Sequence, residues 1–184
     1  MRWGVPGPVT VQKGIVVFYS SAGPDRPADR IWLDTLREYG RPVAVLARPE
    51  PVWRRRVGQR SVDGFLQRID LGYCEEGTML VQVTSQRCLP EHVRVFSTLE
   101  PDALLSEFLL NSSPDGPICR PGELTAGRGR LVVGGSAVEA QRLTCGEYIA
   151  TLAAIGEETV AVVSTAALHE QAVHLLLDTT ASPG

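Results

Sequence analysis

The stretch of sequence with the strongest binding chemistry joins one tryptophan to three consecutive arginines: Trp53, Arg54, Arg55 and Arg56. A guanidinium pairs with a carboxylate or a phosphate through two parallel hydrogen bonds, and an indole offers a flat face for stacking. Because prolines interrupt the surrounding sequence, residues 48–60 are expected to form an irregular surface segment. These four side chains are therefore predicted to bind a protein partner with an acidic surface. An ordinary solvated loop is the alternative.

A second candidate lies where a β-branched and aromatic strand runs into Ser20, Ser21 and Gly23. A strand that ends in such a turn before a helix can hold a phosphate, because free backbone N–H groups and the helix dipole converge there. The segment resembles the phosphate loop of flavodoxins, and the resemblance implies that Ser20, Ser21 and Gly23 contact the phosphate. Pro24 and Asp25 depart from that family, and a carboxylate at a helix N-terminus repels an anion. An ordinary capped turn is the alternative.

The cysteines supply a third candidate. Cys74, Cys88, Cys119 and Cys145 include no Cys-x-x-Cys pair, so neither a zinc knuckle nor a thioredoxin-like motif is predicted. In a reducing cytoplasm the thiols are expected to be free, and no disulfide is expected to be needed for stability. Cys119 stands beside Arg120, whose guanidinium would favour a thiolate. Cys119 is therefore the candidate catalytic nucleophile, with an inert thiol as the alternative.

Other catalytic chemistry is sparse in the sequence. His169 and His174 are spaced too far around a helix to bind one metal ion, so no metal site is predicted. The chain contains no Gly-x-Ser-x-Gly, Walker, His-Glu-x-x-His or Gly-x-Gly-x-x-Gly motif, and no cofactor is predicted. Three histidines and a single lysine offer little acid–base machinery.

These observations favour a non-catalytic domain that binds another protein, as an assembly or regulatory factor. The alternative is a small-molecule enzyme or ligand-binding protein with a pocket between sheet and helices, because active sites can be assembled from scattered residues. Residues 1–70 carry a net charge of +5 and residues 71–184 carry −8, so a second copy of this chain is one candidate for the acidic partner. The sequence pI of about 5.6 argues against nucleic acid.

Hydrophobic periodicity predicts the elements that must position these residues. Strands are predicted at 15–19, 42–47, 78–86, 92–96, 130–133, 138–144, 148–153 and 159–164, with 62–73 ambiguous. Helices are predicted from Asp25 to Tyr39, after the capping box Ser97–Glu100 as far as Asn111, and from Thr165 to about Leu177. The last two helices are expected to bury Leu104, Leu105, Phe108 and Leu109, and Leu168, Ala172, Leu175 and Leu176. Residues 112–129 are expected to form a loop.

The mixture predicts the α+β class, a single domain with a largely antiparallel sheet that ends in a four-strand meander and is covered by about three helices. An α/β sandwich that opens with a strand–helix–strand unit is the alternative. The expected boundaries are an N-terminal arm over 1–13, the domain over 14–178 and a disordered tail over 179–184. The sequence shows neither a signal-peptide pattern nor an apolar run long enough for a membrane helix, so a cytoplasmic location is expected and no membrane partner is predicted.

Overall fold

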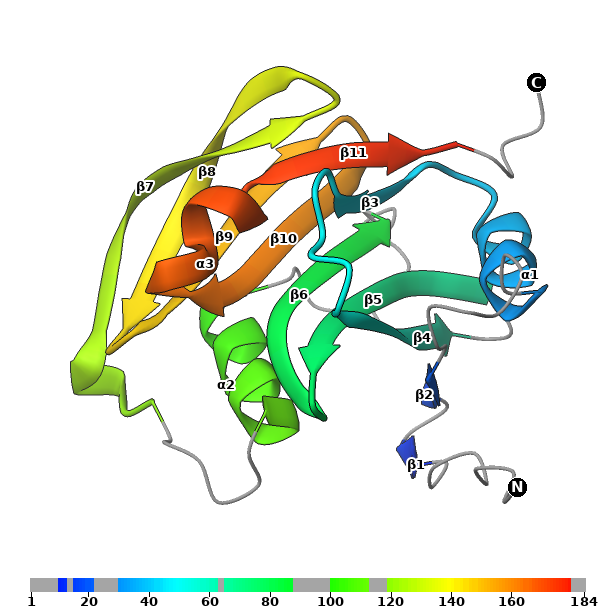
Figure 1. Ribbon diagram of the computed structural model, residues 1–184, viewed down its shortest axis with the longest axis horizontal. Coiled ribbons are helices and arrows are strands. Elements are labelled where there is room, and N and C mark those ends of the chain that lie inside the picture. The colour runs from blue at the N-terminus through cyan, green and yellow to red at the C-terminus, as the bar shows by residue number, and fades with distance from the viewer. Residues whose placement is uncertain are drawn as a thin grey trace.

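The strands pair into one open mixed sheet in the computed structural model of the chain (Figure 1). The structure describes residues 10–12, 15–21, 30–62, 65–87, 100–112 and 119–179. The elements in chain order are β1 Thr10–Gln12, β2 Ile15–Ser21, α1 Arg30–Tyr39, β3 Val43–Leu46, β4 Arg54–Val62, β5 Phe65–Glu75, β6 Thr78–Arg87, α2 Pro101–Ser112, η1 Pro121–Glu123, β7 Leu124–Val133, β8 Ser136–Cys145, β9 Tyr148–Ile155, β10 Glu158–Thr165, α3 Ala166–Ala172 and β11 His174–Asp178. Within these residues the strand order is β1-β2-β4-β5-β6-β10-β9-β8-β7-β11-β3.

The centre of the sheet is the antiparallel pair β6–β10. Its register runs from Glu158 opposite Arg87 to Ser164 opposite Val81. Both strands are buried almost throughout their length. This explains their richness in valine and threonine, because β-branched side chains fill the space between packed layers efficiently.

Two meanders meet at this central pair. On one side β2, β4, β5 and β6 follow each other across the sheet, and on the other side β7, β8, β9 and β10 do the same in the opposite direction. The turns between β7, β8, β9 and β10 contain glycines with positive φ, which an L side chain would resist. The predicted meander is confirmed, and its strands are longer than the sequence pattern indicated.

Each face of the sheet carries its own hydrophobic core, because successive strand residues point to opposite faces. Val160 and Val162 of β10 belong to one core, which also includes residues of α1, β3 and β11. Ala161 and Val163 belong to the other, which is filled by α2. The predicted buried face of α2, namely Leu104, Leu105, Phe108 and Leu109, is confirmed.

The ribbon formed by β3 and β11 folds over the first core instead of extending the sheet outward (Figure 1). Two hydroxyls fix it there. The backbone N–H of Ala44 donates to Oγ of Ser85 at 3.0 Å, and the backbone N–H of Leu46 donates to the hydroxyl of Tyr73 at 3.0 Å. These are the N–H groups of β3 that point away from β11, so side chains of β5 and β6 satisfy the donors of this edge strand.

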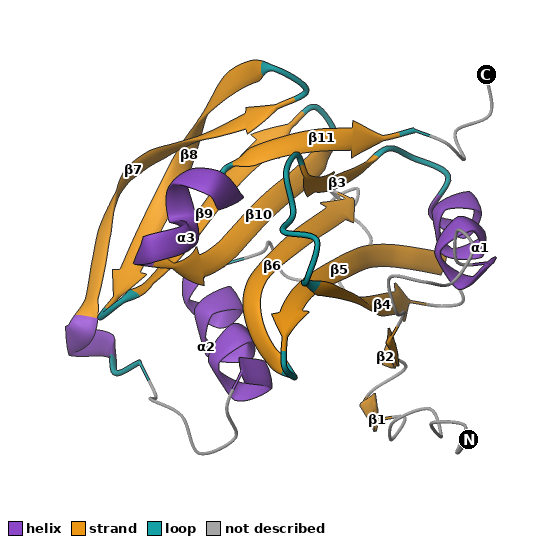
Figure 2. Ribbon diagram, in the orientation of Figure 1, coloured by secondary structure: helices purple, strands orange, loops and turns teal. Residues whose placement is uncertain are grey.

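The α+β class fits only loosely. Strand dominates the described residues, and the helices cover less of the sheet than the sequence predicted (Figure 2). The predicted strand–helix–strand opening exists along the chain as β2, α1 and β3. However, β2 and β3 lie near opposite ends of the strand order. They are therefore not neighbours in the sheet, as the α/β alternative requires.

Three local predictions are wrong. Residues 54–60 are not irregular but belong to β4, which pairs with β5 from Arg54 and with β2 from Arg56. The predicted loop 112–129 contains η1 and the first part of β7. The last helix ends at Ala172, and β11 follows, because its backbone finds partners on both β7 and β3. As a result Leu175 is buried as predicted but Leu176 is 50% exposed. The predicted strand 92–96 and the cap at Ser97 lie outside the described residues.

The hydroxyl of Tyr73 should be essential to the folded-over ribbon. Tyr73→Phe is expected to lower the free energy of unfolding by about 1–3 kcal/mol, because the buried N–H of Leu46 would lose its acceptor. Tyr148→Phe is the matched control, since its ring is only partly buried; its change should stay within about 0.5 kcal/mol. Urea denaturation measures both values, and equal effects would contradict the role assigned to Tyr73.

Candidate functional site

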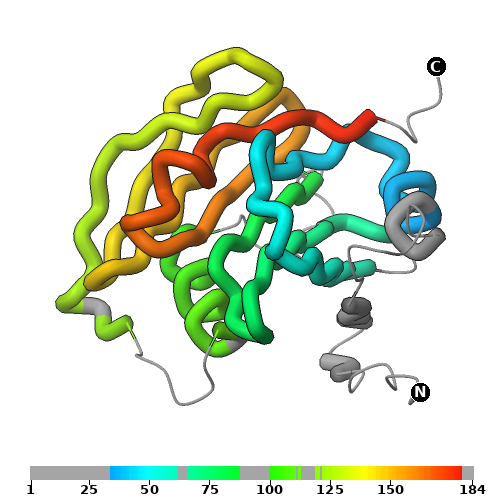
Figure 3. Tube along the Cα trace, in the orientation of Figure 1, coloured from blue at the N-terminus to red at the C-terminus, as the bar shows by residue number. Residues whose placement is uncertain are grey.

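The predicted partner-binding residues do not form one surface. Trp53 is only 8% exposed and belongs to the first core. It ends the loop between β3 and β4 (Figure 3), which is held against α3 by a hydrogen bond of 2.6 Å from Nε2 of Gln171 to the carbonyl of Arg48. The surface-loop prediction is therefore wrong at Trp53. The physical reason is that an indole of this size contributes more free energy by leaving water than by remaining exposed.

Strand geometry separates the three arginines. In β4, Arg54 and Arg56 share one face and Arg55 lies on the other. Burial raises the pKa of the Tyr73 hydroxyl, and the positive charge of Arg55 partly opposes this increase. Arg54 is exposed, and Arg56 donates from Nη2 to the carbonyl of Gly77 at 3.4 Å. A partner could thus reach Arg54 and Arg56 together, but not the whole triplet at once.

The predicted phosphate site is not a turn at its first two residues. Ser20 and Ser21 are the last residues of β2, where their backbones are in register with Val57 and Arg56 of β4. Gly23 lies outside the described residues. Strand pairing engages backbone groups that a phosphate loop would leave free for its ligand.

The expectation of free thiols is wrong for two cysteines. Cys119 and Cys145 form a disulfide with their Cα atoms 6.0 Å apart. A disulfide sulfur is not a thiolate, so Cys119 is not an available nucleophile in this structure. Cys74 is a free, buried thiol whose pKa is raised by burial, and Cys88 lies outside the described residues. Because disulfides persist mainly in oxidising compartments, the cytoplasmic location stays a prediction.

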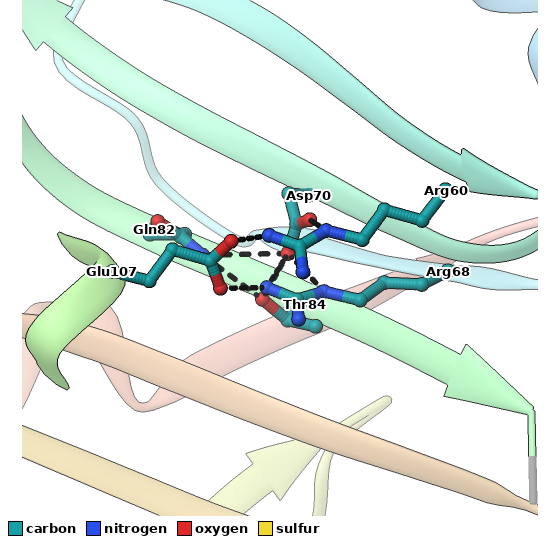
Figure 4. A network of polar contacts seen from close by, with 6 residues as sticks. All are labelled: Arg60, Arg68, Asp70, Gln82, Thr84 and Glu107. Carbon is teal, nitrogen blue, oxygen red and sulfur yellow. Dashed lines mark hydrogen bonds and ion pairs between the residues drawn. The ribbon is translucent and has the colours of Figure 1, made fainter. Parts of the chain in front are cut away.

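A network of charged side chains fastens α2 to the sheet (Figure 4). Arg68 donates from Nε to Asp70 at 2.8 Å and from Nη2 to Glu107 of α2 at 2.7 Å. Arg60 also forms ion pairs with Glu107 and Asp70, and Thr84 donates to Asp70 at 2.6 Å. Two guanidiniums thus face two carboxylates, and the charges balance.

Sequence reasoning missed this network. Its signal was the alternation of polar side chains with valines along a buried strand, where Gln82 and Thr84 lie between Val81, Val83 and Ser85. Buried polar groups require partners, so this pattern predicts a polar layer above the strand. The partners themselves come from β4, β5 and α2, which no local pattern identifies.

A second polar cluster joins the end of α1 to the start of β10. The hydroxyl of Tyr39 donates to Oε2 of Glu158 at 3.0 Å, and Arg41 forms ion pairs with Glu157 at 2.7 Å and with Glu158 at 3.6 Å. The guanidinium of Arg87 lies 4.9 Å from the centre of the Tyr39 ring. Burial raises the pKa of Glu158 despite the opposing effect of Tyr39 and the arginines.

His169 is a packing residue in this fold. Its Nε2 lies 3.1 Å from Oγ1 of Thr151, and its Nδ1 lies 3.2 Å from Oγ of Ser164. Both hydroxyls are fully buried, so a substrate could not reach them. Burial and the nearby Arg142 lower the pKa of His169. His174 lies apart from this cluster, on the exposed side of β11.

The first half of β7 has an open edge and runs along the outer margin of the molecule (Figure 1). All of β7 pairs with β8 on one side. On the other side β11 pairs only with Val132 and Val133. Among the described residues, no strand covers the outer edge from Leu124 to Leu131, and Thr125, Ala126, Gly127, Arg128 and Arg130 are exposed there.

Comparison of the chain with protein-family models, curated proteins and solved structures finds no match. None of the helices within the described ranges is long and apolar enough to cross a membrane. The described residues also contain no group of three or more His, Cys, Asp or Glu side chains that could hold a metal ion.

The disulfide is expected to stabilise the domain. Cys119→Ala together with Cys145→Ala should lower the free energy of unfolding by about 2–4 kcal/mol, because the cross-link restricts the unfolded chain. Thermal unfolding of the oxidised protein, the reduced protein and the double variant measures this. Reductant should not affect the double variant further, and an unchanged midpoint for the reduced parent would contradict the expectation.

The buried imidazole predicts a loss of stability in mild acid. A histidine with a lowered folded pKa binds its proton more readily when unfolded, so stability is present above the unfolded value of 6.5 and falls as the pH drops below it. The contribution of His169 cannot exceed about 1.4 kcal/mol per pH unit, the slope for one proton. His169→Gln should flatten the stability profile between pH 5 and 7, and a profile as steep as that of the parent would contradict the role assigned to His169. Denaturant titrations across that range make the comparison.

Proposed function

We propose that this chain is a non-catalytic protein-binding domain with an assembly or regulatory role. The observation that carries the proposal is the contrast between two sheet edges. On β3, the outward N–H groups of Ala44 and Leu46 are satisfied by the hydroxyls of Ser85 and Tyr73. On β7, the described residues provide no such partner from Leu124 to Leu131. An unpaired strand edge is a template for a strand of another protein.

The use of the polar side chains supports the same proposal. The charged network of Arg60, Arg68, Asp70 and Glu107 is internally balanced and fastens α2. Both ring nitrogens of His169 contact buried hydroxyls. Groups that could have transferred protons or bound anions therefore contribute to the packing of the domain.

A second candidate function is small-molecule binding or catalysis near Glu158. The observation that favours it is a carboxyl group with a raised pKa beside the hydroxyl of Tyr39, since such a pair can exchange a proton. Native mass spectrometry of the protein from its own cells tests this candidate. A bound small molecule that is lost in Glu158→Gln would favour it over the protein-binding proposal.

Site-specific photo-cross-linking in the cells of origin tests the protein-binding proposal. A photoreactive amino acid is placed in turn at five exposed positions on separate elements: Ala103, Ala126, Ala154, Ala166 and Leu176. A protein-binding domain should give a discrete cross-linked product of higher mass from at least one position. Absence of such a product at all five positions would contradict the proposal.

A further inference from the structure

We propose that the outer edge of β7, from Leu124 to Leu131, accepts an extended acidic segment of a partner protein as an additional strand. The inference rests on the proposed protein-binding function and adds the surface, the binding mode and the chemistry of the partner. The segment would carry carboxylates two residues apart, opposite Arg128 and Arg130.

The hydrogen bonds to β11 show which backbone groups of β7 point outward. The N–H of Val132 donates to the carbonyl of Val173 at 2.8 Å, and the N–H of Gly134 donates to the carbonyl of Leu175 at 3.0 Å. Backbone groups alternate sides along a strand, and the register with β8 is unbroken. The N–H and C=O groups of Ala126, Arg128 and Arg130 therefore point outward as well, available to an added strand.

The space that an added strand would occupy beside β7 is bounded at both ends by other elements of the fold. At one end β11 pairs with Val132 and Val133 and then leaves β7 to pair with β3. At the other end η1 precedes β7, and the disulfide between Cys119 and Cys145 ties this region to the end of β8. An added strand would thus occupy the place in the sheet that β11 occupies only beside the last residues of β7.

Charge favours an acidic segment. Arg128 and Arg130 share a face of β7, where their direct neighbours on β8 are Gln141 and Glu139. A strand on the outer edge would place its own residues directly opposite these arginines, and opposite charges in such cross-strand pairs are stabilising. Arg128 would gain the most, because its neighbour on β8 is neutral.

The other face of β7 has room for a bulky residue beside the carboxylate that lies opposite Arg128. A side-chain carbon added at Gly127 would have no atom within 4 Å. The partner's side chains on that face can therefore lie over the glycine without a clash. The segment predicted to fit therefore carries an apolar residue opposite Gly127 and acidic residues opposite Arg128 and Arg130.

A second copy of β7 fits this edge less well than an acidic segment. Antiparallel self-pairing centred on Arg128 places that residue opposite its own copy, and centring on Gly129 places Arg128 opposite Arg130. Centring on Gly127 sets Arg128 opposite Ala126, which avoids the repulsion but gains no ion pair. Like charges directly opposite are destabilising, so the arginines select against self-pairing and for carboxylates.

Amide hydrogen exchange with a defined probe tests the inference. The probe is a synthetic peptide of alternating valine and glutamate, and its control has lysine in place of glutamate. In the free domain, the outward amides of Ala126 and Arg128 should exchange faster than the inward amides of Thr125 and Gly127. The acidic peptide should slow the outward amides about tenfold or more and leave the inward ones unchanged, because only the outward amides gain a partner.

Charge reversal supplies the matched comparison. Arg128→Glu combined with Arg130→Glu should weaken binding of the acidic peptide about tenfold or more, a change of about 1.4 kcal/mol. Arg54→Glu alters an exposed arginine on β4 and should leave binding unchanged. Near-ultraviolet circular dichroism and thermal unfolding establish that each variant is folded before binding is measured.

Several results would overturn the inference. The first two concern amide exchange: equal exchange rates of inward and outward amides in the free domain, or no slowing of the outward amides at a saturating concentration of the acidic peptide. The other two concern binding: equal affinity for the lysine peptide and the acidic peptide, or an equal loss of affinity in Arg54→Glu and in the double charge reversal. The cross-linking experiment tests the proposed function separately from the β7 edge. Cross-linking to a protein from Ala103, Ala154, Ala166 or Leu176 but not from Ala126 overturns the β7 edge and leaves the protein-binding proposal standing. Absence of protein cross-links everywhere removes both.

Discussion

The pairing of β6 with β10 joins the two meanders of the sheet and supplies residues to both hydrophobic cores. It is the only direct strand contact between the two meanders in the described sheet order, and both strands are buried on both faces. Because the side chains of these strands alternate, one seam supplies both cores: Val160 and Val162 face the β3–β11 ribbon, while Ala161 and Val163 face α2. A shift of register by one residue would exchange these two sets and expose the polar layer of Gln82 and Thr84 to an apolar core.

The outer edges of β3 and β7 differ in how their backbone groups are satisfied, and this difference is what suggests a binding function. At the β3 end, hydroxyls from β5 and β6 satisfy the outward backbone donors, so the ribbon is sealed against the sheet. β11 pairs with β7 only at Val132 and Val133, and no strand among the described residues pairs with this edge from Leu124 to Leu131. Charged residues on an exposed edge discourage pairing with identical chains, and Arg128 and Arg130 have that effect here. The same charges favour the acidic strand that we propose as the partner.

Several polar residues that could be catalytic or ligand-binding, judged by residue type, have structural contacts in this fold. Arginines, carboxylates and a histidine are all present, but the fold places Arg60 and Arg68 against Glu107, and His169 between Thr151 and Ser164. Buried polar groups stabilise a fold only when each finds a partner, and these do. The free energy lost by removing these groups from water nearly cancels the free energy gained from their ion pairs and hydrogen bonds. The contacts nevertheless fix the positions of α2 and α3 relative to the sheet.

Elements with a local signal could be predicted from the amino-acid sequence alone. Alternation and glycine turns predicted the meander from β7 to β10, and helical spacing predicted the buried face of α2 at Leu104 and Phe108. The sequence could not determine what depends on distant partners. The apolar residues near the C-terminus suit a helix or a strand equally, and only backbone partners on β7 and β3 make them β11. Trp53 was predicted to be a surface anchor, but it is buried in the core that also includes residues of β3 and β11. Cys119 was predicted to be a free thiol, but it forms a disulfide with Cys145. In each case the deciding interaction joins residues far apart in the chain, so only the tertiary structure could supply it.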